Sequence, residues 1–319
     1  MPLTKSASSV MNRNGVGEKL RELFSDGLKE NEILAPYTTF RIGGPADFFY
    51  SARTPEKLCN AILLAEELGL KYFVLAGGSN LLINDNGYRG LIIKIDCFKM
   101  KTDGERITAQ SGVDLQEVCN LAAKNSLSGM ECLTGIKGSL GGAIYGNAGA
   151  FGRSISEILE SAVIFAPSGE IKVVGPDYFE FKYRHSKLKL NREVILSSVL
   201  KLSKGDKTAI ESKMAEIAEL RHTKHPTTEG SAGSFFKNIR EGDKVTPAGI
   251  LLEQVGAKEM RDGDASVYYK HANILVNLGQ AKACQVWQIT RILKQRVKDR
   301  FGITLEDEVR YLGESGLEN

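Results

Sequence analysis

The sequence has few of the features that mark secreted, membrane-spanning or disulfide-rich proteins. Five cysteines are scattered over 319 residues, and no Cys-x-x-Cys pair is present. An odd, scattered set disfavours a disulfide framework or a zinc ribbon and is typical of a reducing compartment. No apolar run approaches the roughly 18 residues that span a bilayer, and residues 1–20 lack the apolar stretch of a secretory signal. We therefore expect a cytoplasmic protein that does not enter a membrane.

An excess of charge of one sign is also lacking. The chain carries 42 basic and 39 acidic residues, which gives a formal net charge of +3. Because basic and acidic residues are nearly equal in number, the charge does not predict binding to the polyanionic surfaces of nucleic acids or membranes. Hence we expect no nucleic-acid partner.

Histidine is scarce, with four in the chain. Only His222 and His225 are close in sequence, and they stand at the expected end of a helix beside Arg221 and Lys224. The helix dipole favours cations at such an end. No acid or thiol lies within this stretch to complete a set of metal ligands, so we expect no metal site.

Glycine, in contrast, is abundant and concentrated in a few segments. An apolar strand over 71–76 leads directly into Gly77, Gly78, Ser79 and Asn80, and the densest glycine stretch covers 135–152 without a helical or strand period. Neither segment has the GK[ST] of a P-loop or a G-x-G-x-x-G before a helix. Glycine exposes backbone N–H groups to phosphate oxygens. The pair suits a dinucleotide, and the alternative is that the glycines only form tight turns.

Apolar periodicity outlines a mixed α and β chain with more than one domain. A helix is expected from Thr54 as N-cap and Pro55 as first helical residue to Gly69, with Leu58 and Ile62 on its apolar stripe. A change of composition near Gly205 suggests a domain boundary. The other elements expected are a short helix near 16–26, helices over 115–126, 203–220 and 282–299, and strands over 46–52, 90–95, 106–112, 161–166, 170–175 and 192–203.

Two further segments contain residues with possible chemical roles. Arg41 in TTFRIGG suits either support of a loop or neutralisation of a phosphate. Ser234 in GSAGSFFKN lies between a flexible stretch and an aromatic pair, where a serine can donate a proton or only shape a turn. The residues alone do not decide between these uses.

Taken together, seven segments in this order resemble one family over residues from about 30 to 313. It is the UDP-N-acetylenolpyruvoylglucosamine reductase family, flavoenzymes of peptidoglycan precursor synthesis. The matching segments are TTFRIGG, LAGGSNLLINDNGYRG, GIKGSLGGAIYGNAGAFG, YRHS, GSAGSFFKN, KHANILVN and GITLEDEVR.

The resemblance implies an α+β fold with an FAD-binding module like that of the vanillyl-alcohol-oxidase flavoproteins. Residues 1–27 would form a tail and short helix, and 28–204 the FAD module in two subdomains split near 96. Residues 205–300 would form a smaller α+β substrate domain, and 301–319 a tail that returns to the active site.

The resemblance also implies FAD as cofactor, NADPH as co-substrate and a UDP-sugar substrate, with a monomeric enzyme. No histidine precedes His185, so a histidyl link to the early loops is excluded and we expect non-covalent FAD. The FAD contacts carried over from the family are Arg41, Gly77, Gly78, Ser79, Asn80, Gly135, Ser139, Gly141, Gly142, Asn147, Ala148 and Gly149.

Catalytic roles are carried over in the same way. Arg184 in YRHS would bind and polarise the substrate carboxylate, Ser234 would donate a proton, and Glu308 in LEDEV would stabilise the enol intermediate. Tyr183, Lys237 and Asn238 would contact the substrate. From the residues alone, Arg184 resembles a surface charge and Glu308 one acid of a solvated tail.

The chain departs from the family pattern at Lys137, Asp307 and Ile239, where prolines are usual. These changes remove no chemical group, but Asp307 leaves the choice among Glu306, Asp307 and Glu308 open. Two other classes remain: a different oxidase or dehydrogenase on the same FAD module, and a nucleotide-binding protein without catalysis.

Overall fold

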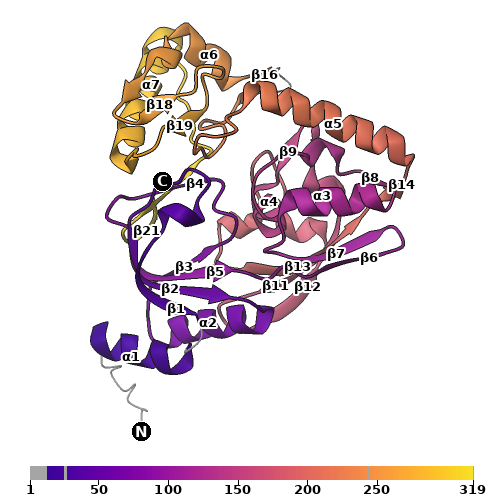
Figure 1. Cartoon of the computed structure of the whole chain (residues 1–319), viewed down its shortest axis with the longest axis vertical. Coiled ribbons are helices and arrows are strands. Elements are labelled where there is room, and N and C mark those ends of the chain that lie inside the picture. Colours follow the sequence, from indigo (N-terminus) through magenta and orange to yellow (C-terminus); the bar gives the residue numbers. More distant parts are fainter. Residues whose placement is uncertain (1–12, 25–26, 243, 319) are drawn as a thin grey trace.

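The computed structural model describes residues 13–24, 27–242 and 244–318 (Figure 1). Residues 1–12, the first part of the tail and short helix expected over 1–27, lie outside these residues. The short helix expected near 16–26 is present as α1 (Arg13–Leu23). No helix in the described ranges combines the length and the apolar character needed to cross a bilayer.

The first sheet has four strands in the order β1-β2-β5-β3. Thr54 caps the helix that follows β2 by accepting from the Lys57 N–H, and Gly69, with φ of +61°, follows the helix end as predicted. β5 lies between β2 and β3 and is parallel to both, so β3 forms an edge of the sheet. These elements are β1 (Leu28–Ile33), β2 (Pro45–Ala52), α2 (Pro55–Glu67), β3 (Tyr72–Leu75) and β5 (Tyr88–Ile95).

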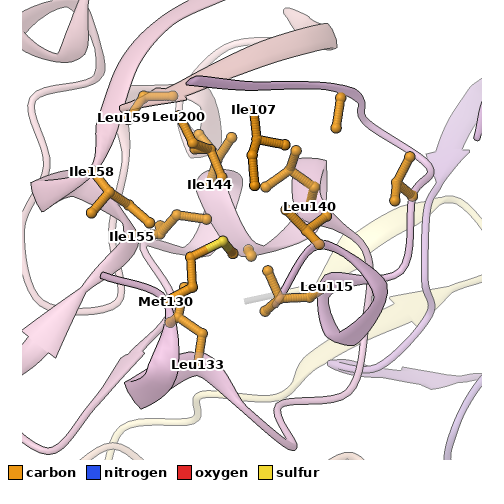
Figure 2. Close-up of a cluster of buried hydrophobic side chains, with 14 of the residues drawn as sticks. Ile107, Leu115, Met130, Leu133, Leu140, Ile144, Ile155, Ile158, Leu159 and Leu200 are labelled. Carbon is orange, nitrogen blue, oxygen red and sulfur yellow. The ribbon is translucent and has the colours of Figure 1, made fainter. Parts of the chain in front are cut away.

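The second sheet has five antiparallel strands in the order β12-β11-β13-β7-β6. Helices α3 and α4 cover one face of it, and the aliphatic side chains between these layers form the core cluster drawn in Figure 2. The elements are β6 (Met100–Asp103), β7 (Arg106–Gln110), α3 (Leu115–Lys124), α4 (Leu140–Gly146), β11 (Leu159–Phe165), β12 (Ile171–Val174) and β13 (Val194–Lys201), with the small pair β8 (Leu127–Ser128) and β14 (Ser203–Lys204) beside them.

Helix α4 corrects one expectation, because the glycine-rich segment 135–152 was predicted to have no regular structure. Ser139 caps this helix by accepting from the Gly142 N–H at 3.2 Å, and Leu140 and Ile144 share one buried face. A Cβ on Gly141 would lie 2.6 Å from that of Ser111. Glycine therefore allows the helix to approach its neighbour closely, although glycine lowers helix propensity.

The third part of the chain surrounds α7, which buries Val286, Ile289, Leu293 and Val297 as its spacing predicted. α5 lies along the second sheet's helices, where Met214 packs against their core, and α6 belongs to the cluster around α7 (Figure 1). The elements are α5 (Lys207–Lys224), β15 (Ile239–Glu241), β16 (Lys244–Thr246), α6 (Ala248–Gln254), β17 (Arg261–Asp262), β18 (Ala265–Val267), β19 (Leu275–Asn277) and α7 (Ala283–Phe301). The domain limits near residues 96 and 205 stay predictions.

The C-terminal segment returns to the first part of the chain. β20 (Arg310–Gly313) forms a hairpin with β21 (Gly316–Glu318) and pairs in parallel with β4 (Leu81–Ile83). Because β4 directly follows the Gly77–Asn80 turn, this pairing places residues 308–310 beside that turn. Four of the cysteines are buried and Cys284 is exposed, and all five are free thiols.

Candidate active site

A cavity of about 710 Å³ lies between the edge strand β3, the Gly77–Asn80 turn, α4 and residues 188–195. The two glycine segments meet at its wall. A Cβ on Gly77 would lie 2.7 Å from the Ser139 nitrogen, and one on Gly138 would lie 2.5 Å from the Ser79 hydroxyl. The backbones are therefore in contact, which only residues without a side chain permit.

The FAD contacts that we carried over fall into two groups. Seven of them border the cavity, namely Gly77, Gly78, Ser79, Asn80, Ser139, Gly141 and Gly142. The others lie outside its wall. Arg41 is exposed and donates to the Thr228 carbonyl at 3.0 Å, which is a loop-supporting contact. Gly135 faces the side chain of Arg221.

Asn147, Ala148 and Gly149 lie just beyond the cavity wall. Asn147 ends α4 in a left-handed conformation and donates to the Lys182 carbonyl at 3.0 Å, and the Gly149 carbonyl accepts from Arg184. The Asn147 Oδ1 atom is buried and has no hydrogen-bond partner among the described residues. Asn147 and Gly149 therefore link the end of α4, beside the cavity, to residues 182–184.

The cavity has the features that a flavin dinucleotide needs. A Cβ on Gly142 would meet only the Ser139 hydroxyl, at 3.3 Å, and one on Gly146 would meet nothing within 4 Å, so the α4 wall is open toward the cavity. The buried Ser111 hydroxyl at the cavity has no partner among the described residues. The outer edge of β3 pairs with none of the described strands, so its backbone groups remain free for a ligand.

Arg184 and Glu308, 124 residues apart in sequence, form an ion pair in which Nε lies 2.6 Å from Oε1. The Glu308 N–H donates to the Phe235 carbonyl at 2.8 Å, next to Ser234. The Asn80 amide donates to the Glu308 carbonyl at 2.9 Å. These contacts bring Arg184, Glu308 and the segment that contains Ser234 close to the Gly77–Asn80 turn, and none of the three residues borders the cavity itself.

The three consecutive acids of the C-terminal segment have separate partners. Glu306 pairs with Lys237 at 3.0 Å on the surface, and Asp307 pairs with Lys294 at 2.6 Å. Only Glu308 faces Arg184. Among the departures from the family pattern, Lys137 is exposed and Ile239 begins β15.

Two of the candidate substrate residues, Tyr183 and Asn238, contact each other, whereas Lys237 pairs with Glu306. The Tyr183 hydroxyl accepts from the Asn238 N–H at 3.4 Å, and the Asn238 side-chain oxygen accepts from the Ala248 N–H. The Arg240 guanidinium covers the Tyr183 ring, 4.0 Å from its centroid. A planar, partly charged platform results, which is suited to a polar ring or an anion.

The cavity-wall residues that sequence reasoning missed include Tyr145, Lys189 and Arg310. Arg310 donates to the Tyr145 hydroxyl at 2.6 Å, and Lys189 donates to the Arg184 carbonyl at 2.8 Å. Burial and the nearby Arg310 lower the pKa of Lys189 to about 8. Arg310 lies two residues beyond Glu308, so the recognised segment already contained it, whereas no sequence pattern pointed to Lys189.

Two parts of the chain match known protein families. Residues 225–312 match a family model described as the UDP-N-acetylenolpyruvoylglucosamine reductase C-terminal domain, and residues 46–175 match an FAD binding domain. The second match supports FAD as the cofactor. The described residues contain no group of three or more His, Cys, Asp or Glu side chains arranged to hold a metal ion.

Whole-chain relatives extend the match. UDP-N-acetylenolpyruvoylglucosamine reductase of Clostridium tetani is 38% identical over 95% of this chain and 97% of its own, and that of Solibacter usitatus is 40% identical over 88% and 95%. The crystal structure of the reductase from Thermus caldophilus superposes with a TM-score of 0.75 at 33% identity, covering 88% of this chain and 97% of that one. The expected α+β flavoprotein fold is confirmed. The chain belongs to the UDP-N-acetylenolpyruvoylglucosamine reductase family, FAD-dependent oxidoreductases of peptidoglycan precursor synthesis.

Proposed function

We propose that this chain uses NADPH to reduce UDP-N-acetylglucosamine enolpyruvate to UDP-N-acetylmuramate, with Arg184, Ser234 and Glu308 at the reacting end of the cavity. The observation that supports this most strongly is the Arg184–Glu308 ion pair beside a glycine-walled cavity. When bound there, FAD would supply the redox chemistry by taking a hydride from NADPH and giving it to the terminal carbon of the enolpyruvyl group.

Arg184 then acts on the charge that the hydride leaves behind. Negative charge builds on the carbon next to the substrate carboxylate, and a guanidinium spreads that charge into the carboxylate through its fixed donors. Nε donates to Glu308 and Nη1 to the Gly149 carbonyl, while Nη2 has no protein partner among the described residues. Nη2 is therefore the group that we assign to the carboxylate.

Ser234 completes the reaction by giving a proton to the same carbon. The carbonyl of its neighbour Phe235 accepts from the Glu308 N–H. This backbone hydrogen bond joins the segment of the proton donor to the residue that pairs with Arg184. Glu308 orients Arg184 and stabilises the enol form of the substrate. Tyr183, Lys237 and Asn238 are our candidates for contacts with the UDP-sugar, and we expect a monomeric cytoplasmic enzyme.

Anaerobic flavin absorbance tests the proposal in two steps. NADPH should bleach the FAD band of the purified holoenzyme, and the enolpyruvyl substrate should restore it with formation of the lactyl ether. Restoration by other acceptors but not by this substrate would identify a different oxidase or dehydrogenase on the same FAD module. A protein that cannot take up FAD would be a nucleotide-binding protein without catalysis.

A further inference from the structure

Arg184 occupies a backbone position that normally belongs to glycine. Lys182 and His185 exchange both of their backbone hydrogen bonds, each at 3.1 Å, so Tyr183 and Arg184 form a two-residue turn between them. The φ angle of Arg184 is +53°. A non-glycine residue pays for this conformation, which persists only where the surroundings hold it. We therefore expect other residues to hold the turn in this conformation through direct contacts.

Lys189 provides a direct contact with that turn. Its Nζ donates to the Arg184 carbonyl at 2.8 Å, across five residues of chain. The 3-10 turn Lys187–Lys189 brings the Lys189 side chain to this carbonyl. Leu188 fixes the backbone of the turn because it is buried in the core cluster of the second sheet. Lys189 therefore binds the carbonyl of Arg184, the residue that adopts the left-handed conformation.

The position is electrostatically unfavourable for a lysine. Lys189 is half-buried at the cavity wall, close to the cations Arg310, Lys237 and Arg184, with Glu308 as the nearby acid. A lysine without a specific contact would extend into water rather than stay among like charges. The hydrogen bond to the Arg184 carbonyl holds Lys189 at this wall, together with a contact in which Nζ lies 5.8 Å from the centroid of the Tyr145 ring.

We infer that Lys189 is a positioning residue that holds the Arg184 turn in its left-handed conformation and so aims the guanidinium at the substrate carboxylate. This inference rests on the proposed role of Arg184. Lys189 acts through the backbone of that residue, and no contact of its own with the substrate is required.

Lys187 offers a matched control on the same 3-10 turn. Its Nζ pairs with Glu180 at 3.1 Å, and it does not border the cavity. Lys189→Met and Lys187→Met each remove one ammonium group and keep an unbranched side chain of similar length. A difference between them therefore isolates the contact with the Arg184 carbonyl from a general loss of charge.

The experiment measures three quantities for each variant: FAD affinity by flavin fluorescence, the rate of flavin reduction by NADPH, and the rate of flavin reoxidation by the enolpyruvyl substrate. Lys189→Met should slow reoxidation roughly ten- to a hundred-fold, as expected for a misplaced group, while the other two quantities stay near those of the unchanged protein. Lys187→Met should resemble the unchanged protein in all three, and Lys189→Arg, which keeps a donor, should recover part of the rate.

A double variant separates this inference from the proposed function. If Lys189 acts through Arg184, Lys189→Met should add little to the loss caused by Arg184→Lys. A slow Arg184→Lys variant with a fully active Lys189→Met variant would overturn the inference and leave the role of Arg184 intact. Weaker FAD binding with normal reoxidation in Lys189→Met would also overturn it, because Lys189 would then be a cofactor contact.

Discussion

Arg184 uses two of its donors within the protein, Nε toward Glu308 and Nη1 toward the Gly149 carbonyl. A lysine keeps the positive charge but has one ammonium group, which cannot reproduce this fork and also reach a carboxylate. We expect Arg184→Lys to slow flavin reoxidation by the substrate roughly ten- to a thousand-fold, as for loss of one charge-stabilising donor. Unchanged turnover in stopped-flow measurements would return Arg184 to the surface-charge interpretation.

Ser234 can be tested by timing the two halves of the reaction separately. Reduction by NADPH needs no proton from Ser234, so Ser234→Ala should leave that step nearly unchanged. Reoxidation by the enolpyruvyl substrate should slow at least a hundred-fold, as is typical of a positioned acid. Cysteine at this position should keep part of the rate, because a thiol can also give a proton.

Ser231, in the same GSAGS segment, is the matched control for Ser234. Its hydroxyl accepts from the Gly233 N–H at 3.2 Å, so it serves the turn itself. Any loss in Ser231→Ala should fall on both half-reactions alike. If Ser234→Ala behaves in that way too, Ser234 is a turn residue, and the proton must come from Glu308 or from water.

Whether the role of a single residue could be predicted depends on how far away in the sequence its partners lie. Glu308 and Arg184 are 124 residues apart, and nothing local to either residue indicates their ion pair. The family resemblance placed both at the site, whereas composition alone favoured a surface charge and a solvated tail. The partners of Glu306 and Asp307 likewise come from distant segments, which is why the three acids could not be told apart beforehand.

At the scale of elements, local signals predicted the helices that begin and end with standard chemistry. The helix α2 has a Thr54 cap and a terminal Gly69, and α7 shows a clear apolar spacing, so both were placed closely. Helix α4 was missed because Gly141 is needed for close contact with Ser111 rather than for helix formation. Tertiary packing overrides propensity there, and a sequence window cannot contain that information.

The open α4 wall gives a prediction about Gly142. A valine there would place a branched side chain in the cavity, since a Cβ at this position meets only the Ser139 hydroxyl. Gly142→Val should therefore purify with little or no FAD and bind added FAD poorly in fluorescence titrations. Gly175→Val is the control, because Gly175 has open surroundings and lies away from the cavity. Normal FAD content in Gly142→Val would place the cofactor elsewhere.

The C-terminal end of α5 gives a prediction about pH. Burial, together with nearby Arg221 and His271, lowers the pKa of His225 to about 4 from its ordinary 6.5. Below about pH 6.5 the unfolded chain therefore binds a proton that the folded chain resists until about pH 4, so stability falls as the pH drops through this range. The ring centroids of His225 and His271 lie 5.8 Å apart, and burial lowers the pKa of His271 as well.

Urea unfolding at pH 7.5 and pH 5 measures this effect. The unchanged protein should lose stability at pH 5, and His225→Asn should lose less, by on the order of 1 kcal/mol after allowance for partial exposure. His222→Asn, an exposed histidine on the same helix, should lose as much as the unchanged protein. Equal losses in the His225 and His222 variants would show that His225 does not titrate as proposed.

At the scale of the whole molecule, three distant parts of the chain close the cavity region. β20 meets the Gly77–Asn80 turn because it pairs in parallel with β4, and the α4 segment meets the turn where Gly77 lies against Ser139. Long-range parallel pairing of this kind leaves no local trace in the sequence. The resemblance predicted that the tail returns to the site, whereas periodicity predicted only several domains.

A cofactor held by these separate segments should stabilise all of them together. Ligand that binds only the folded state contributes about 2.7 kcal/mol at a free concentration of 100 Kd. For a chain of 319 residues, the melting temperature should then rise by roughly 4 °C at that FAD concentration. Such a rise with increasing FAD is expected in thermal melts of the apoprotein.

The same cofactor should be held without a covalent bond. Among the described residues, the cavity is bordered by neither histidine nor cysteine, the side chains that most readily form such links to flavins, and the earliest histidine of the chain is His185. Acid precipitation of the holoenzyme should therefore release yellow flavin into the supernatant, in an amount equal to that bound before precipitation. Because a covalent bond survives acid, flavin that stays in the protein pellet would contradict the prediction and would direct attention to the tyrosines at the cavity, with Tyr145 first.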